Sequence, residues 1–358
     1  LELNGYVTQA LMNKHGWANV QVAEKIALSA SILEQDISAE LRVQHLWSMI
    51  TYHHVASDRS EVMRLSLQLD DWAKSRNDRS VQVAAHTWIG LAHYSEGRFD
   101  QAEDALSLAV QLHDPQAHAH HASRFGFDTL AWAKAARALV RWAAGYDALA
   151  EEDASAAVAR GRELGHAPSL GIALLYQGLS ELGRQRHDRA LAAVEELIDL
   201  ANQYGLPAFM GYAQIIRCWA KGEVTHADGA IEALWVIGCR YCQTYYRAFA
   251  AQTLAQQQKW HEAIERVNTS LTLADTLQEK LYLAELHLHK ARYLHASGAG
   301  LNNINPALES AISIAREGGK YRIEAEALRL FGQLNPGAER ETRQRLHELY
   351  LLRPDLAQ

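Results

Sequence analysis

The spacing of small residues in one stretch of the chain most constrains how it can fold. Gly90 and Ala102 stand twelve residues apart, and Gly97 lies between them. Glycine readily adopts the positive φ that ends a helix, and small side chains let two helices approach closely. The stretch therefore predicts an antiparallel pair of helices, the first over about 81–95 and the second over about 100–115.

The same spacing recurs, for example between Gly178 and Ala190 and between Ala251 and Ala263. A single helical hairpin cannot bury its apolar face, so consecutive hairpins must stack into a solenoid. We therefore predict an all-α chain. Copies of varying clarity span residues 40–75, 137–164, 170–201, 211–236, 245–274 and 280–316.

The hairpins resemble the tetratricopeptide repeat at most of its signature positions. His86 and His93 stand where that repeat usually has Trp and Tyr. The resemblance implies a tetratricopeptide-like helical-hairpin solenoid that forms a right-handed superhelix. We expect one array over 1–358, with degenerate leading repeats in 1–80, central repeats in 81–316 and C-terminal capping helices in 317–358.

The charge and hydropathy of the chain argue against several kinds of partner. The net charge is −7 and no run of basic residues occurs, whereas nucleic-acid binding needs clustered Lys and Arg. No run of about twenty apolar residues predicts a membrane span, and no signal-peptide pattern opens the sequence. Leu1 is not an initiator Met, which favours a piece of a longer protein. We expect that protein to be cytoplasmic.

Three cysteines, Cys218, Cys239 and Cys242, fit a reducing compartment better than a disulfide framework. Cys239 and Cys242 form a CxxC within a stretch, 233–249, that has a helical pattern. Zinc would need two further ligands, and a redox motif would need a turn between a strand and a helix. We expect both thiols to pack as small apolar groups.

A histidine-rich linker follows the central hairpin, with His113, His118, His120 and His121 close together. Imidazole together with carboxylate suits zinc or nickel, so a metal-dependent enzyme is a distant alternative. With 18 histidines in the chain, however, local clustering is unsurprising. We expect an extended loop without metal.

Catalytic signatures are missing from the sequence. It has no GxxxxGK[ST] or GxGxxG phosphate loop, no GxSxG and no HExxH. Neighbouring carboxylates such as Glu103 and Asp104 fit solvated helix faces. We therefore predict no enzymatic activity, no catalytic residues, no metal and no cofactor in this segment.

A concave binding surface remains as the functional candidate. In tetratricopeptide-like arrays the first helix of each pair lines this side, at positions −6, −3, +1 and +4 from its small residue. These positions are rich in aromatic and aliphatic residues, and several arginines also fall on first helices. The residues predicted to contact a partner are Tyr94, Trp132, Arg137, Arg141, Trp142, Tyr176, Arg217, Tyr245 and Arg247.

Most of residues 80–330 also resemble one group of bacterial signalling proteins. Matching passages include LHDPQAHAHHASRFGFD, ARGRELGHAPSLGIALLYQG and LYLAELHLHKARYLHASG. In that group a STAND-type ATPase precedes a helical repeat region and is linked to a nucleotide cyclase or a DNA-binding domain. The resemblance implies a regulatory repeat module and leaves the attached effector open.

Together these features predict a non-catalytic sensor that binds a partner protein, a peptide or a small inducer in its concave groove. The alternative is a constitutive module for self-association, with a possible homo-oligomer. The sequence leaves open the ligand, the oligomeric state and the curvature of the array.

Overall fold

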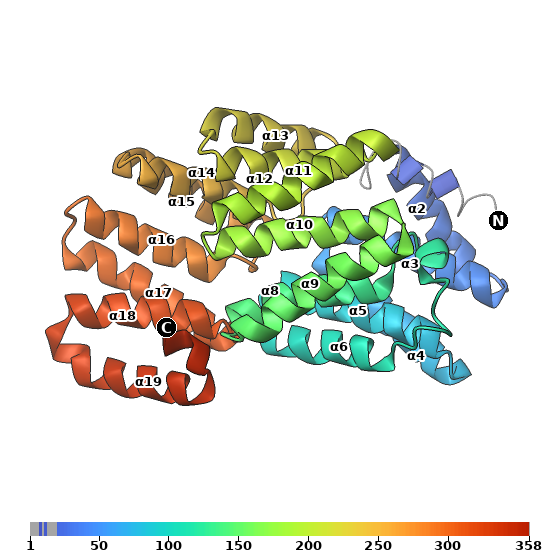
Figure 1. Ribbon diagram of the computed structural model, residues 1–358, viewed down its shortest axis with the longest axis horizontal. Coiled ribbons are helices and arrows are strands. Elements are labelled where there is room, and N and C mark those ends of the chain that lie inside the picture. Colours follow the sequence, from blue (N-terminus) through green and yellow to red (C-terminus); the bar gives the residue numbers. More distant parts are fainter. Residues whose placement is uncertain (1–6, 9–10, 13–19, 358) are drawn as a thin grey trace.

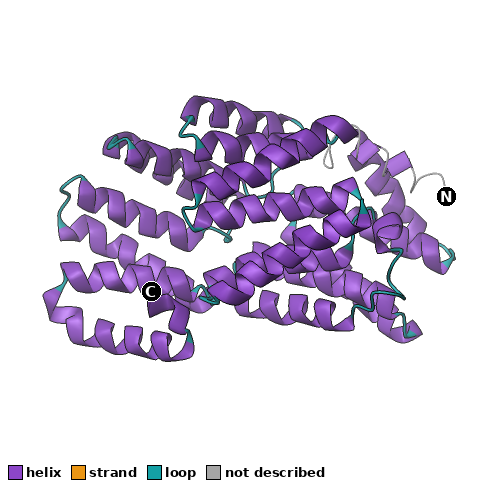
Figure 2. Cartoon of the chain, in the orientation of Figure 1, coloured by secondary structure: helices purple, strands orange, loops and turns teal. Residues whose placement is uncertain are grey.

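The computed structural model describes residues 7–8, 11–12 and 20–357, and the regular structure in these residues is entirely helical (Figure 2). In chain order the α-helices are α2 (Val20–Leu33), α3 (Ala39–Val55), α4 (Arg59–Arg76), α5 (Arg79–Ser95), α6 (Phe99–Leu112), α7 (His121–Phe125), α8 (Thr129–Ala143), α9 (Asp147–Leu164), α10 (Ala167–Gly183), α11 (His187–Tyr204), α12 (Pro207–Ala220), α13 (Val224–Val236), α14 (Gln243–Gln256), α15 (Trp260–Leu277), α16 (Leu283–Ala296), α17 (Leu301–Gly318), α18 (Tyr321–Leu334) and α19 (Glu339–Leu352). Two short 3₁₀ helices, Pro336–Ala338 and Pro354–Ala357, flank α19. None of the described helices combines the length and the apolar character that crossing a membrane requires.

Consecutive helices pack as antiparallel hairpins, and the hairpins stack side by side into a curved array (Figure 1). The pairs are α3–α4, α5–α6, α8–α9, α10–α11, α12–α13, α14–α15, α16–α17 and α18–α19. The predicted all-α solenoid is confirmed.

Small residues bring the two helices of a hairpin together, as the spacing predicted. A Cβ added to Gly90 would lie 2.5 Å from Cγ of Leu106, and one added to Gly178 would lie 2.9 Å from Cγ1 of Val194. The small residues twelve positions later, Ala102 and Ala190, are completely buried. Real Cβ atoms essentially never come this close to another atom, so a larger residue at either position would have to displace the side chain of Leu106 or Val194.

Local signals set the ends of the helices. The side chain of Ser38 accepts a hydrogen bond from the N–H of Leu41 and caps α3. Gly97 has a φ of 74° in the turn between α5 and α6. Glycine adopts this left-handed conformation more easily than other residues do. The turn predicted at Gly97 is therefore confirmed.

The polar stretch before Ala307 is helical, although its Asn and Pro residues are more typical of a loop. Helix α17 begins at Leu301 and includes Pro306. Ile304 is 1% exposed and holds this turn against the core. Pro306 is the sixth residue of α17, so it removes one hydrogen bond within the helix, and the burial of Ile304 helps to hold the first turn in place.

The CxxC pair lies in a connection, not within a helix as its pattern suggested. Cys239 follows the end of α13, and Cys242 has a φ of 57° directly before α14. The thiols are free and buried, as a packing role requires. Burial raises the pKa of Cys239 to about 11, so this thiol stays protonated near neutral pH.

The array curls until its late segments touch its early turns. The phenol O–H of Tyr321 donates to Asp100 over 2.9 Å. Arg322 donates from Nε to the carbonyl oxygen of Trp142 over 2.9 Å and pairs with Asp147 at 2.5 Å. We call these three interactions the closing contact. They place the hairpin α18–α19 against the turns after α5 and α8, as Figure 1 shows.

A second contact across the curl involves the loop before α14. The backbone N–H groups of Arg240 and Tyr241 both donate to the carbonyl oxygen of Val55, over 2.8 and 3.1 Å. The end of α3 thereby receives a loop that lies almost 190 residues later in the chain. The concave side of the solenoid is consequently enclosed.

Replacing Gly90 by Ala should destabilise the fold by about 1–3 kcal/mol, because the new methyl group overlaps Leu106 in a packed interior. Gly229→Ala is the matched control, since no atom lies within 4 Å of a Cβ added there. That change should stabilise α13 by about 0.5–1 kcal/mol. Urea unfolding of both variants measures the two effects. Equal shifts in the midpoint would contradict the role of Gly90.

Arg322→Ala should loosen the closing contact, because it removes a hydrogen bond and an ion pair to the α8–α9 turn. Hydrogen exchange measured by mass spectrometry should then be faster in α18 and α19 and unchanged in α10 and α11. Arg343→Ala is the control, because Arg343 pairs with Glu339 within the same hairpin. Identical exchange in both variants would argue against closure by Arg322.

Candidate functional site

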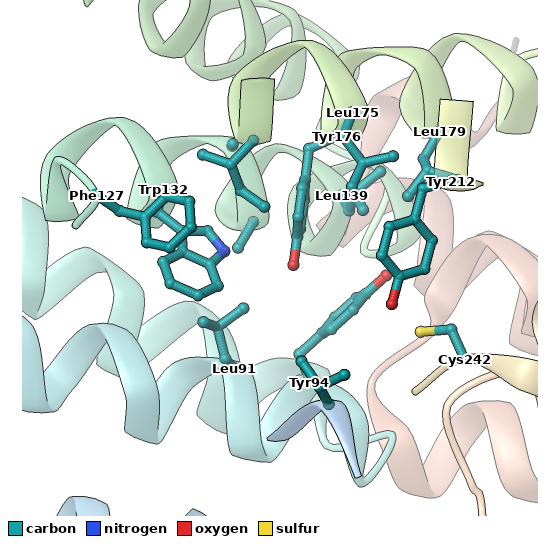
Figure 3. Packing of buried hydrophobic residues seen from close by; sticks show 14 of the residues in the cluster. Leu91, Tyr94, Phe127, Trp132, Leu139, Leu175, Tyr176, Leu179, Tyr212 and Cys242 are labelled. Atoms are coloured by element: carbon teal, nitrogen blue, oxygen red, sulfur yellow. The ribbon is translucent and has the colours of Figure 1, made fainter. Parts of the chain in front are cut away.

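The first helices of the hairpins line an enclosed cavity on the concave side, which we call the inner cavity. Figure 3 shows the side chains from several helices that face this common space. Its volume open to the centres of water-sized molecules is about 50 Å³. The predicted concave positions that line it are Tyr94, Trp132, Leu139, Ile172, Leu175, Leu179 and Tyr245.

The wall of the inner cavity is mostly aromatic. The rings of Trp88 and Trp132 are 4.7 Å apart and meet edge to face. The ring of His54 lies 4.2 Å from that of Tyr241. Burial lowers the pKa of His54 to about 3 and raises the pKa of Tyr176 to about 12, so both groups are neutral at pH 7. The described lining carries no charged side chain at that pH.

A larger opening, the outer groove, lies between the ends of α8, α10, α12 and α14 and the helices α16 and α18. It offers about 500 Å³ to water-sized molecules. Its wall combines aromatic rings with amide and charged groups, a mixture that is common on surfaces that bind peptides. Its lining includes Trp142, Gln185, Trp219, Tyr245, Gln252, Trp260, Tyr282, Glu285, His289, Arg292, Tyr293 and Glu326.

Gln252 is at the centre of a polar cluster in the outer groove. Its Nε2 lies 2.8 Å from Nε2 of His289 and donates to the hydroxyl of Tyr282 over 3.1 Å. Burial lowers the pKa of His289 to about 3, so the ring is neutral and its Nε2 accepts. Among the described residues no group donates a hydrogen bond to the amide oxygen of Gln252, so this oxygen can accept from a ligand N–H.

A small space of about 30 Å³, which we call the neck, shares lining residues with both the inner cavity and the outer groove. Tyr94, Leu139 and Tyr245 line both the neck and the inner cavity, and Tyr245 also reaches the outer groove. Lys320 closes one side of the neck: its Nζ lies 2.6 Å from both carboxylate oxygens of Glu285. Burial lowers the pKa of Lys320, and the carboxylate of Glu285 opposes this shift.

The predicted aromatic residues come together on the concave side. Tyr94, Trp132 and Tyr176 line the inner cavity. Trp142 lies in the outer groove, and Tyr245 contacts both spaces. The structure thus brings all five of them to one continuous surface.

The four predicted arginines do not face this surface. They do not lie at positions −6, −3, +1 or +4 from the small residue of the first helix, which are the positions that face the concave side. Their side chains point toward second helices instead. Arg137 and Arg141 pair with Asp153 at 2.7 and 2.9 Å. Arg217 lies 3.8 Å from Glu195, and Arg247 lies 3.8 Å from Glu232. We leave these arginines out of the proposed site.

Several residues of the outer groove were missed because the register of α16 is hard to read from sequence. The small residue of each clear first helix lies five residues before its end, as Gly90 does in α5. In α16 this position is Ala291, but the link to α17 is one residue longer than that between α14 and α15. The twelve-residue spacing is therefore lost. Counted from Ala291, the concave positions are Glu285, Leu288, Arg292 and His295, and the first three line the groove.

The histidine-rich linker forms turns and the short helix α7, and it packs against α5 and α8. His121 lies between Oγ1 of Thr129, 2.6 Å from Nδ1, and Oγ of Ser80, 2.8 Å from Nε2. Burial lowers its pKa to about 2. Within the described residues no cluster of three or more His, Cys, Asp or Glu is arranged to hold a metal ion.

The chain has similarities to known proteins. No protein-family model matches it. An uncharacterised protein of Rhizobium meliloti (strain 1021) is 22% identical over 270 residues, which cover 73% of this chain and 26% of that protein. The chain therefore spans about a quarter of the length of this curated relative.

Two solved structures have a similar fold. A Rap protein complexed with Competence and Sporulation Factor aligns with a TM-score of 0.62 and 12% identity, over 99% of this chain and 98% of that one. The Cut9–Hcn1 hetero-tetramer of the APC/C aligns with a TM-score of 0.54 and 14% identity, over 91% of this chain and 56% of the other. At these identities the likeness is one of fold.

Replacing His289 by Gln should weaken the dependence of stability on pH. His289 has a pKa of about 3 in the fold and about 6.5 when unfolded. As pH falls below 6.5 the unfolded chain takes up a proton that the folded chain does not, so stability falls by up to about 1.4 kcal/mol per pH unit for this residue. Urea midpoints at pH 7, 5.5 and 4.5 measure the slope. His261→Gln, at an exposed position, is the control; equal slopes in both variants would contradict the assignment.

Proposed function

We propose that this chain is a non-catalytic regulatory module that binds a peptide in the outer groove. The feature that supports this most strongly is the combination, in one groove, of several aromatic rings with the unbonded amide oxygen of Gln252. An extended peptide exposes N–H and C=O groups at every residue, and the amide of Gln252 is placed to pair with one of them. The rings of Trp142 and Trp260 would contact its side chains.

The charges of the groove indicate what kind of peptide fits. Arg292 pairs with Glu326 at 2.7 Å, and Lys320 pairs with Glu285. These four charges cancel, so the groove has no strong preference for an acidic or a basic ligand. A peptide of low net charge with aromatic or aliphatic side chains is the ligand that we infer. The Rap protein of similar fold was crystallised in complex with Competence and Sporulation Factor, and this agrees with a ligand-binding role for the array.

Binding would act on the rest of the protein through the curl of the array. Tyr245 and Glu285 line the neck beside Lys320, which directly precedes the residues of the closing contact. A ligand that binds the closed and the open array with different affinity would shift the balance between them. Since the chain covers a quarter of its curated relative, we infer that an effector domain elsewhere in the protein reads this change. A STAND-type ATPase linked to a cyclase or a DNA-binding domain is the effector that the sequence resemblance suggests.

We further propose a cytoplasmic module that binds neither nucleic acid nor membrane. The three free cysteines and the net charge of −7 support this part of the proposal.

Selection of a random linear heptapeptide library on the purified chain tests peptide binding. Peptides enriched on the native chain should bind Gln252→Ala and Trp142→Ala at least tenfold more weakly in isothermal titration calorimetry, because both changes remove groove contacts. Trp72→Ala is the control, since Trp72 packs beside Arg76 on α4, away from the groove. If no peptide is enriched, or if enriched peptides bind all variants equally, the proposal is wrong.

A further inference from the structure

We propose that the inner cavity is a second binding site, for a small, uncharged, largely aromatic molecule that carries a hydrogen-bond acceptor. The cavity is distinct from the outer groove, and the proposal holds whether or not a peptide binds there. It is carried by three features of the cavity: its poorly paired donors, its aromatic wall and its lack of charge.

Poorly paired hydrogen-bond donors surround the inner cavity. Trp88 is completely buried, and its indole N–H has no hydrogen-bond partner. The indole N–H of Trp132, which is 4% exposed, lies beside the hydroxyl of Tyr176 without forming a regular hydrogen bond. The hydroxyl of Tyr241 is buried beside Tyr176 and Cys242 and likewise forms no regular hydrogen bond. Figure 3 shows the indole nitrogen of Trp132 directed toward the space beside Tyr176. Since leaving a buried donor unpaired costs free energy, a ligand with an acceptor oxygen would recover that cost.

The wall suits a flat ring. Trp88 and Trp132 meet edge to face, and the ring of Phe127 lies 5.1 Å from that of Trp132. Aromatic pairs favour offset-stacked and edge-to-face arrangements, which a planar ligand can make with several of these rings at once. The volume of about 50 Å³ refers to the centres of water-sized spheres, so the space that atoms can fill is larger. It suits one ring-sized molecule or a few ordered waters.

The electrostatics exclude a charged ligand. His54 is neutral at pH 7, and the other described groups of the lining are aromatic, aliphatic, a threonine and a thiol. A buried ion would lose its hydration without gaining a counter-charge. The nearest ion pair, Lys320 with Glu285, lies at the neck and is satisfied within itself.

The neck provides the route of entry. Tyr245 contacts the inner cavity, the neck and the outer groove, so movement of this one ring connects the three spaces. Entry from the groove does not require the hairpins to separate.

Two probes of equal shape separate recognition of the acceptor from simple filling of space. Acetophenone carries a carbonyl oxygen, and α-methylstyrene has a CH₂ group at the same place. Isothermal titration calorimetry should show acetophenone binding at least tenfold more tightly than α-methylstyrene, because only the ketone can accept from the indole N–H groups. Equal affinity for both probes, or no binding of either because ordered water fills the cavity, would overturn the proposal.

Trp132→Phe keeps a ring at the same place and removes one donor, so it should reduce the preference for acetophenone at least threefold. Trp260→Phe, in the outer groove, should leave that preference unchanged. Leu175→Phe fills the cavity and should abolish binding of both probes. Circular dichroism and urea unfolding verify that each variant is folded. A preference that survives Trp132→Phe and Trp88→Phe alike would refute recognition by the indole donors.

Discussion

Close approach of helices at small residues is the constraint on which the structure depends. Gly90 and Gly178 admit Leu106 and Val194 into space that any side chain would occupy. Close packing within each hairpin lets the hairpins stack, and a small rotation from one hairpin to the next curves the array. The curl brings α18 and α19 round to the turns after α5 and α8. The enclosed concave side, with its inner cavity and its outer groove, follows from that curl.

The polar groups on the concave side divide into two kinds. Gln252, Tyr282 and His289 satisfy one another in the outer groove and still present hydrogen-bonding capacity to a ligand. In the inner cavity the indole N–H groups of Trp88 and Trp132 are buried without a regular hydrogen bond, although the hydroxyl of Tyr176 lies beside Trp132. Buried polar groups are normally paired, so the second arrangement is the more costly one. A groove that is open to water can be empty at little cost, whereas the cavity favours an occupant.

Much of the fold could be predicted from the sequence, because its signals are local. The spacing of Gly90 and Ala102, the turn at Gly97 and the cap at Ser38 each act within a few residues. The same spacing placed Trp132 and Tyr245 on the concave side. The twelve-residue spacing is absent at α16, because the link from α16 to α17 is one residue longer than the corresponding link after α14. The partner of Ala291 therefore lies thirteen residues later, and the concave positions of this helix were missed.

The remaining differences arise from contacts that leave no local pattern. Arg322 and Asp147 are 175 residues apart, and nothing near either of them indicates that they meet. The arginines on first helices looked available because their partners, such as Asp153 and Glu195, lie on other helices. The sequence therefore could not predict the curvature of the array or the enclosure of the site.

The closing contact also affects how the molecule comes apart. In an open solenoid each repeat touches only its neighbours, so the terminal repeats can fray while the middle remains folded. Here the last hairpin is held by turns from the first half of the chain. The late repeats therefore contact early repeats as well as their neighbours in sequence. Fraying of α18 and α19 must break bonds to α6 and α8 as well as to α17. Unfolding should accordingly be more cooperative than the repeat architecture alone implies, with early and late repeats lost in the same transition.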